Sequence, residues 1–251
     1  MSLYRDDGIV LRTQKLGEAD RIVTILTRRN GRVRAVGKGV RRTKSRFGAR
    51  LEPFTHVDLL LYTGRSLDVI TQAETVRAYG EPLAVDYPRY TSGTAMLETA
   101  ERFTPMEKEP IIRQFLLLVG GLRALGERVH DPRLVLDAYL LRTLAVAGYA
   151  PALDECAVCG TPDEASPGDL TGSRSFAVPA GGLTCRSCRP PGAASPAVAT
   201  IALMRALLRG DWARADASQA RHQVECSSLV AAYVQWHLEH SIRSLRHVEH
   251  V

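Results

Sequence analysis

The sequence has no long hydrophobic run. Its uninterrupted apolar stretches, such as Phe115–Val119, are far shorter than the roughly 20 residues that a membrane-spanning helix needs. Charged residues at positions 5–7 precede any apolar segment, so the N-terminus does not resemble a signal peptide. We therefore expect an intracellular, cytoplasmic protein with no membrane partner.

The motifs of common catalytic sites are also missing. There is no Walker-type glycine loop, no HExxH and no nucleophile elbow. Asp6 and Asp7 could hold the metal of a nuclease, but adjacent residues of an extended strand face opposite sides. Asp131 and Asp137 are a second such pair, but Asp131 precedes Pro132 and fits a helix N-cap. We expect a binding protein without catalytic residues, with a metal-dependent nuclease as one alternative.

Acidic residues are absent from residues 28–50. Gly31, Gly37 and Gly39 interrupt this run and favour a loop that approaches a ligand closely. Unpaired guanidinium groups cannot be buried, so the run must face water or a polyanion. A solvated loop is the plain alternative, and a nucleic-acid backbone is the interpretation that we prefer. The ten basic residues, our candidate DNA-binding residues, are Arg28, Arg29, Arg32, Arg34, Lys38, Arg41, Arg42, Lys44, Arg46 and Arg50.

The positive charge is confined to the N-terminal third. The whole chain of 251 residues has a net charge of +6. Residues 1–80 carry 16 basic and 8 acidic side chains, and residues 81–251 carry 17 basic and 19 acidic ones. Such a distribution indicates that one module meets phosphates and that the other parts have different roles.

The first eighty residues show the pattern of short strands. Strands are predicted at 8–12, 21–27, 32–36, 55–62 and 67–77, with a tight hairpin turn at Asn30-Gly31. In the third strand Arg32 and Arg34 share one face, and Val33 and Ala35 share the other. Five strands in this length predict a small closed barrel of the OB kind, with an SH3-like barrel as the alternative.

Helices are predicted from Pro88 onward, at 90–103, 110–125, 132–147, 196–208 and 227–245. The third is apolar on more than one side, so we expect it at the centre of a helical domain. The fold class is thus α+β and multidomain. We expect an OB-fold domain at 1–80, a helical domain at 81–153 and 193–251, and a zinc-binding module inserted at 154–192.

Two cysteine pairs lie between the helical parts. Cys156 and Cys159, like Cys185 and Cys188, are separated by two residues, which lets one turn present two thiolates to a metal. Four sulfurs predict one structural Zn²⁺ without an open position for catalysis; disulfides or bare thiols are the alternative. Residues 163–175 are rich in Gly, Pro, Ser and Asp and indicate a flexible loop. Cys226, in another segment, is expected to be a buried thiol.

Long phrases of the sequence resemble a known family. GIVLRTQKLGEADRIVTILTRRNGRVRAVGKGVRRTKSRFGARLEPFTHVDLLLY is similar to the N-terminal domain of the RecO family of bacterial recombination mediators. The order GYAP, CAVCG, GGLTCRSC and the closing LRSLR resemble its zinc-bearing C-terminal part. The resemblance implies an OB-fold domain, a helical bundle, and a role in recombinational DNA repair.

The same resemblance implies particular activities and partners. These are binding of single-stranded and double-stranded DNA (ssDNA and dsDNA), annealing of complementary strands at the nucleoid, and assistance to RecA loading. The implied partners are RecR and, in some members, the single-strand-binding protein. A generic RNA-binding or transcription factor built from a zinc ribbon and an OB fold is the alternative.

Aromatic side chains are few in the first eighty residues. Only Tyr4, Phe47, Phe54, Tyr62 and Tyr79 occur there, and we expect Phe54 and Tyr62 to pack within strands. OB modules that hold single strands tightly usually stack bases on aromatic rings. We therefore expect contacts mainly to phosphates, which leave base edges free for annealing.

Overall fold

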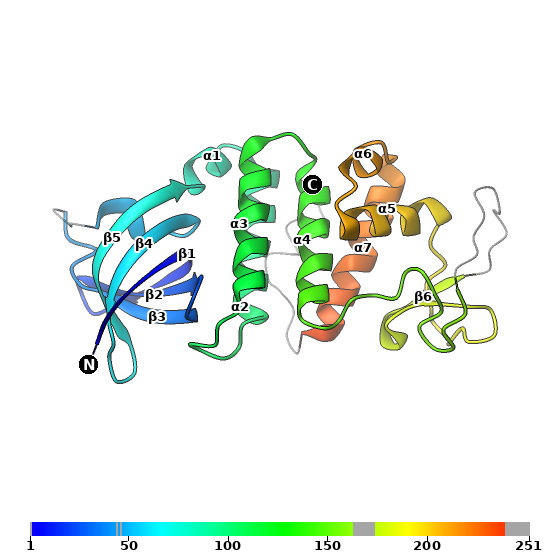
Figure 1. Cartoon of the computed structure of the whole chain (residues 1–251). Coiled ribbons are helices and arrows are strands. Elements are labelled where there is room, and N and C mark those ends of the chain that lie inside the picture. The colour runs from blue at the N-terminus through cyan, green and yellow to red at the C-terminus, as the bar shows by residue number, and fades with distance from the viewer. Residues whose placement is uncertain (1, 44, 46, 163–173, 239–251) are drawn as a thin grey trace. The chain divides into compact units, whose positions relative to one another are not determined.

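Five strands close into a barrel in the first part of the chain (Figure 1). The strand order is β1-β2-β3-β5-β4, closed by pairing of β1 with β4, and the β3–β5 pair is parallel. This five-stranded barrel is OB-like, which confirms the predicted fold of this part. A short 3-10 helix, η1, lies between β3 and β4 at Gly48–Leu51. The strands are β1 Leu3–Leu16, β2 Asp20–Thr27, β3 Gly31–Gly37, β4 Thr55–Tyr62 and β5 Asp68–Ala78.

The structure is a computed structural model that describes residues 2–43, 45, 47–162 and 174–238. The chain divides into two compact units, residues 1–129 and 130–251. None of the described helices is long and apolar enough to cross a membrane. Residues 163–173, which belong to the predicted glycine-rich loop, lie outside the described residues. So does the part of the last predicted helix beyond residue 238.

Alternation of side chains builds the barrel core. In β3, Val33 and Ala35 are fully buried, and Arg32 and Arg34 lie on the outer face. This arrangement follows from the two-residue period of a strand and was predicted. Residues 28–30 form the turn between β2 and β3, because Gly31, which has a positive φ of 63°, already pairs with Thr27.

Three helices belong to the same unit as the barrel: α1 Gly80–Ala84, α2 Tyr87–Arg102 and α3 Ile112–Glu127. The ring of Phe54 lies 5.5 Å from that of Tyr90 on α2. His56 on β4 meets Phe115 on α3 edge-on at 5.8 Å. Arg12 on β1 donates two hydrogen bonds of 2.8 Å to Glu101 at the end of α2. Helices α2 and α3 are thus anchored to the barrel by both apolar and charged contacts.

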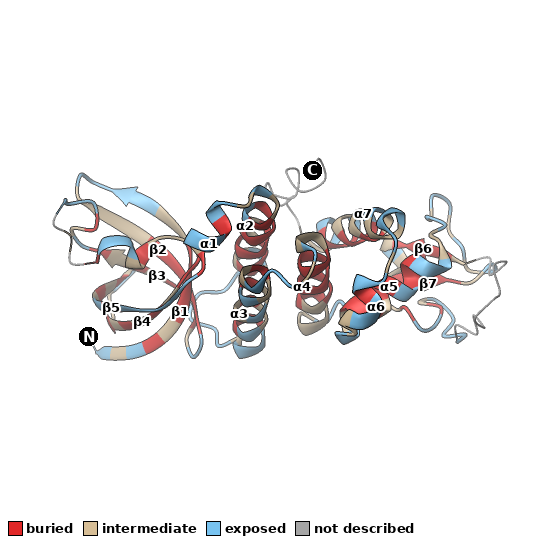
Figure 2. Cartoon of the chain, turned by 90° about the horizontal axis from the view of Figure 1, so that it is seen from above, coloured by how far each residue is buried: buried red, intermediate tan, exposed pale blue. Residues whose placement is uncertain are grey.

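The second unit is organised around one buried helix, α4. Every residue from Leu134 to Leu141 is buried, as Figure 2 shows. The predicted N-cap is present, because the Asp131 side chain accepts a hydrogen bond of 2.8 Å from the Arg133 N–H. The helices of this unit are α4 Pro132–Val146, α5 Val198–Arg209, α6 Trp212–Asp216 and α7 Ala220–His237.

The start of α4 is as predicted, whereas α2, α3 and α5 begin two or three residues from their predicted starts and α7 begins seven residues earlier than predicted. Helix α5 begins at Val198, because its N-cap is Ala197, whose N–H is bound by the Glu225 carboxylate of α7 at 3.1 Å. Helix α7 begins at Ala220, seven residues before the predicted Ser227. Its first two turns are mostly polar and partly exposed, so apolar periodicity does not reveal them.

Candidate nucleic-acid interface and metal centre

The basic run of residues 28–50 is divided by β3 between the two ends of the barrel. Arg28 and Arg29 lie in the β2–β3 turn, and Lys38, Arg41 and Arg42 follow the other end of β3. A strand of 7 residues spans about 20 Å, so these groups do not form one continuous patch. Lys44 and Arg46 lie outside the described residues.

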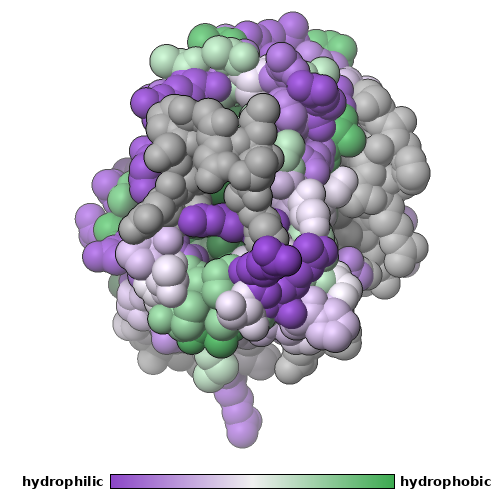
Figure 3. Space-filling view, turned by 90° about the vertical axis from the view of Figure 1, so that its right-hand side faces the viewer, coloured by the Kyte–Doolittle hydropathy of each residue, from purple (hydrophilic) through white to green (hydrophobic). Residues whose placement is uncertain are grey.

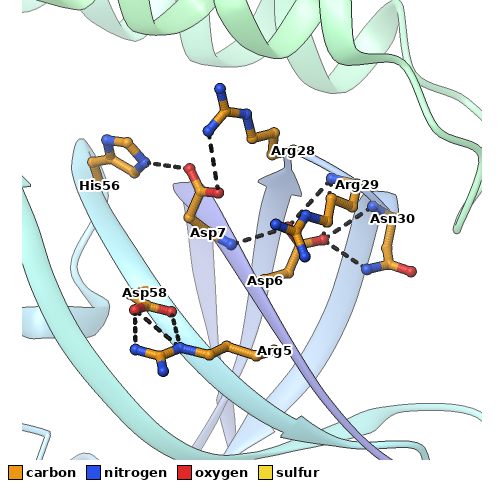
Figure 4. Close-up of polar contacts among 8 residues, drawn as sticks. All are labelled: Arg5, Asp6, Asp7, Arg28, Arg29, Asn30, His56 and Asp58. Carbon is orange, nitrogen blue, oxygen red and sulfur yellow. Dashed lines mark hydrogen bonds and ion pairs between the residues drawn. The ribbon is translucent and has the colours of Figure 1, made fainter.

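At the first end, Asp6 holds the β2–β3 turn in place (Figure 4). Its carboxylate is buried and accepts hydrogen bonds from the backbone N–H groups of Arg29 and Asn30. The side-chain amide of Asn30 donates a further bond of 2.6 Å. Asp7 faces the other side and contacts His56 at 3.0 Å and Arg28 at 4.0 Å. Both carboxylates therefore serve the barrel rather than forming a nuclease metal pair.

Between the two ends, the outer face of β3 is covered by residues 103–111, which we call the strap. Arg32 lies 3.7 Å from Glu101, and Arg34 lies 3.7 Å from Glu107. The Lys108 N–H donates to the Arg32 carbonyl at 3.0 Å. Two of the candidate DNA-binding residues thus have acidic partners that lie about 70 positions away in the sequence.

At the other end, the β3–η1 loop presents exposed cations. Its backbone is fixed, because the Gly39 N–H donates to Asp20 at 2.7 Å and the Arg41 N–H donates to the Ala19 carbonyl. Lys38, Arg41 and Arg42 are exposed, and within the described part of the chain no carboxylate pairs with them. Arg50 follows in η1 and is partly buried.

The aromatic side chains of the first eighty residues do not form a stacking platform. Phe47, Phe54 and Tyr79 are buried, and the Tyr4 hydroxyl donates to the buried Asp68. Tyr62 was expected to pack in its strand, but 38% of it is exposed, because it lies at the end of β4. Single-strand-binding OB modules use several such rings in a row, so this barrel presents cations in place of rings.

The four predicted cysteine ligands converge in the second unit. Their Sγ atoms all lie within 4.8 Å of one another, and Cys159 and Cys185 are 3.9 Å apart. Four sulfurs bound to one metal at about 2.3 Å would be roughly 3.8 Å apart, so the residues fit a tetrahedral ion. All five cysteines of the chain are free thiols, and Cys226 is buried as expected. The four grouped cysteines indicate one structural metal ion.

Local backbone geometry prepares the thiols for this ion. The backbone N–H groups of Cys159 and Cys185 point at the Cys156 sulfur and lower the pKa of that thiol to about 6. Close contact with Cys185 and Cys159 raises the pKa of Cys188 to about 12. Without a metal, Cys188 therefore keeps its proton at neutral pH, because a further thiolate would be repelled by its neighbours; a bound cation removes this repulsion and favours the deprotonated form.

Short strands and helix side chains hold the metal module in the second unit. Strands β6 Ser175–Ala177 and β7 Gly182–Thr184 pair antiparallel, with the 3-10 helix η2 Val178–Ala180 between them. Phe176 packs edge-on against Tyr233 of α7 at 5.7 Å. Arg205 of α5 donates to the Leu153 carbonyl and pairs with Asp154 at 3.1 Å. The face shown in Figure 3 carries small hydrophobic areas between hydrophilic side chains.

The fold and the sites define a class of protein. It combines an OB-like barrel that carries exposed cations with a helical unit that carries a four-cysteine metal module. Two family models match the chain: "Recombination protein O N terminal" at residues 1–79 and "Recombination protein O C terminal" at residues 84–246.

Whole-chain comparisons agree with these matches. The chain is 68% identical over 249 residues to the DNA repair protein RecO of Thermobifida fusca, covering 99% of each chain. It is 60% identical over 255 residues to that of Streptomyces griseus, covering 99% of this chain and all of the other. It is 60% identical over 247 residues to that of a Nocardioides species, covering 98% and 99%. The chain belongs to the RecO family of DNA repair proteins.

The sequence interpretation missed the strap. Glu101, Glu107 and Lys108 lie in a region that was assigned only as helix and connection, and they contact β3 and β5 of the barrel. The available signal was weak: charged residues of both signs stand between Pro105 and Pro110, where a plain surface loop is the ordinary interpretation.

Proposed function

We propose that this RecO-family protein is a non-enzymatic recombination mediator that binds ssDNA and dsDNA through backbone phosphates. The observation that carries the proposal is the β3–η1 loop, where Lys38, Arg41 and Arg42 are exposed without carboxylate partners among the described residues. Side chains of this kind bind phosphates without reading sequence. Lys44, Arg46 and Arg50 of the same segment would extend this proposed surface, and Arg28 and Arg29 at the opposite end of β3 would form a separate group of phosphate contacts.

Annealing of complementary strands follows from the same chemistry. A protein that holds phosphates and stacks few bases leaves the base edges free to pair. Its cations also lower the repulsion between two strands that approach each other. In the cell we expect this activity at the nucleoid, where the protein would act with RecR to load RecA onto DNA coated by single-strand-binding protein.

We propose Zn²⁺, one per chain, as the metal of the four-cysteine module. Four thiolates in a tetrahedral arrangement favour Zn²⁺ over the oxygen-preferring cations Mg²⁺ and Ca²⁺. Cys156, Cys159, Cys185 and Cys188 would hold it, and four protein ligands leave no position for a reacting water. Its role would be to stabilise the fold of the second unit.

The test reverses charge at two positions of the loop. We expect Arg41→Glu with Arg42→Glu to weaken binding of an oligonucleotide at least tenfold, as measured by fluorescence anisotropy. Removing two phosphate contacts should lower the slope of log affinity against log salt by about 1.4 for a single strand. Annealing of complementary oligonucleotides should fall in parallel.

The matched control reverses Arg214 and Arg221, which are exposed on helices α6 and α7 of the second unit. We expect this variant to bind DNA like the unaltered protein. An equal loss of DNA affinity in the two double variants would contradict the assignment of the β3–η1 loop as the DNA-binding surface. Equal affinity for RNA of the same sequence would favour a general nucleic-acid-binding protein instead.

A further inference from the structure

The strap lies along the strand that carries Arg32 and Arg34. It makes a short parallel bridge to β3 between Glu107 and Arg32. Pro105 accepts a hydrogen bond from the Arg32 guanidinium, and Lys108 pairs with the buried Asp68 at 2.9 Å. Where the strap crosses the β2–β3 turn, a Cβ at Gly31 would meet the Glu109 carbonyl oxygen at 1.8 Å, so only glycine fits.

The strap satisfies the two guanidinium groups that it covers only in part, because Pro105 accepts from the Arg32 Nη2–H but no group accepts from either Nε–H in the described structure. The ion pairs of Arg32 with Glu101 and of Arg34 with Glu107 are 3.7 Å long, beyond hydrogen-bond distance. The Nε atoms of both arginines are buried and have no hydrogen-bond partner in the described structure. The Glu101 carboxylate instead accepts its short hydrogen bonds from the Arg12 Nε–H. A buried N–H donor without an acceptor is energetically unfavourable. A ligand that offers an acceptor to these Nε–H groups would therefore bind in place of the strap.

The strap itself has few apolar anchors. All residues from Pro105 to Pro110 are exposed, and Met106 is 63% exposed. Lys108 has a φ of 61°, a left-handed conformation that residues other than glycine rarely adopt. Exposed segments with few buried contacts are the parts of a protein that open most easily. The strap can therefore leave β3 without unfolding the barrel.

We propose that the strap is a displaceable cover over a second phosphate-binding site, formed by Arg32 and Arg34 on the outer face of β3. The ligand is the phosphodiester backbone of DNA, whose oxygens replace the Pro105 carbonyl and the Glu107 carboxylate of the strap and accept from the free Nε–H groups. This inference rests on the proposed function. The exposed β3–η1 loop binds DNA first, and opening of the strap adds contacts along β3.

The test compares two single-charge changes on the strap of the full-length protein. Glu107→Gln removes the partner of Arg34, whereas Glu109→Gln removes an equal charge that has no ion pair in the described structure. We expect Glu107→Gln to bind a single-stranded oligonucleotide roughly threefold to tenfold more tightly, with a salt slope steeper by about 0.7. Glu109→Gln should change the affinity much less. The gain should vanish when Arg34→Gln is added to Glu107→Gln.

A second measurement follows the strap directly. The Lys108 amide is hydrogen-bonded to the Arg32 carbonyl, so displacement of the strap must expose it to exchange. We expect amide hydrogen exchange in residues 103–111 to become faster when a saturating oligonucleotide is added. Unchanged or slower exchange would overturn the proposal that the strap is a displaceable cover. Equal DNA affinities of Glu107→Gln and Glu109→Gln would overturn it as well.

These outcomes are separable from those of the proposed function. If Arg41→Glu with Arg42→Glu binds DNA normally, phosphate binding by the barrel is itself wrong. If that variant loses DNA affinity but Glu107→Gln binds DNA no more tightly than Glu109→Gln, the β3–η1 loop remains supported as a DNA-binding surface and the second site is contradicted. A Glu107→Gln variant that unfolds at a lower temperature than Glu109→Gln without an affinity gain would give the strap a structural role only.

Discussion

Asp6 resembles a catalytic carboxylate in the sequence, but in the structure its carboxylate makes hydrogen bonds that stabilise the fold. It is 3% exposed and accepts from two consecutive backbone N–H groups of the β2–β3 turn and from the Asn30 side chain. Hydrogen bonds to a charged acceptor are among the strong ones, and leaving their donors without a partner is unfavourable. The turn that places Arg28 and Arg29 therefore depends on this carboxylate.

We expect Asp6→Ala to lower the free energy of unfolding of the first unit by about 3 kcal/mol. Both tryptophans, Trp212 and Trp236, lie in the second unit, so their fluorescence does not report on the barrel. Hydrogen exchange of the β2 and β3 amides in urea is the appropriate measurement. Asp7→Asn is the control and should have a smaller effect, because Asp7 is more exposed and its pair with Arg28 is 4.0 Å long. Equal effects would show that the turn does not depend on Asp6.

Asp137 gives the second unit a dependence on pH. Burial on α4 raises the pKa of this carboxyl to about 7, although a hydrogen bond of 2.6 Å from Ser227 opposes the rise. The folded protein thus keeps the proton up to near neutrality, and the unfolded chain releases it near pH 4. Stability from this group is complete below pH 4 and is lost as the pH rises to about 7.

The Asp137→Asn variant isolates this effect, because the amide does not ionise and its oxygen still accepts from Ser227. Relative to the unaltered protein, we expect the variant to gain stability steadily between pH 4 and pH 7, by on the order of 4 kcal/mol in total. Urea unfolding followed by tryptophan fluorescence at several pH values measures the difference. A difference that does not change with pH would show that Asp137 titrates normally.

At the scale of elements, the metal module is connected to two helices of its unit. The Tyr233 hydroxyl of α7 donates to the Gly181 carbonyl at 3.3 Å, and Arg205 of α5 reaches the Leu153 carbonyl. In its described residues the module has two strands of 3 residues each, β6 and β7, and few buried apolar side chains. Metal-binding energy is therefore expected to supply much of its folding energy.

We predict that Cys159→Ser lowers the metal content to well under one ion per chain and destabilises the second unit. Cys159 is exposed, so the change removes a ligand without leaving a large cavity. Elemental analysis and thermal unfolding followed by tryptophan fluorescence are the measurements. Cys226→Ser is the matched control, because it alters a buried thiol outside the cluster and should retain the metal. Full metal content in Cys159→Ser would contradict the four-ligand site.

The elements that the sequence predicted are those set by local patterns. All five strands were expected within a few residues of their bounds except β1, which is longer at both ends, and the Asn30-Gly31 turn fixed the register of β2 and β3. The two-residue spacing of each cysteine pair likewise determines how a turn presents its sulfurs. The coverage of Arg32 and Arg34 was not predictable in this way, because Glu101 and Glu107 approach them through tertiary packing across about 70 residues.

At the scale of the whole molecule, the change from strand to helix at residue 80 lies inside the first compact unit. Helices α1–α3 belong to the same compact unit as the barrel, and this unit extends to Val129. Phe54 packs so closely on α2 that a Cβ at Gly93 would lie 2.9 Å from its ring. The positive excess of residues 1–80 is partly offset within this unit by Glu101 and Glu107.

We therefore predict that residues 1–129 form the smallest fragment that folds and binds DNA. Ending the chain at residue 80 would expose the apolar surface around Phe54 and leave Arg12 and Asp68 without Glu101 and Lys108. We expect fragment 1–129 to unfold cooperatively and to bind an oligonucleotide with the salt slope of the full-length protein, because the proposed phosphate contacts all lie within it. Fragment 1–80 should aggregate or lack cooperative unfolding, and circular dichroism during urea titration measures both. A fragment 1–129 that folds but has a much shallower salt slope would place further phosphate contacts in the second unit.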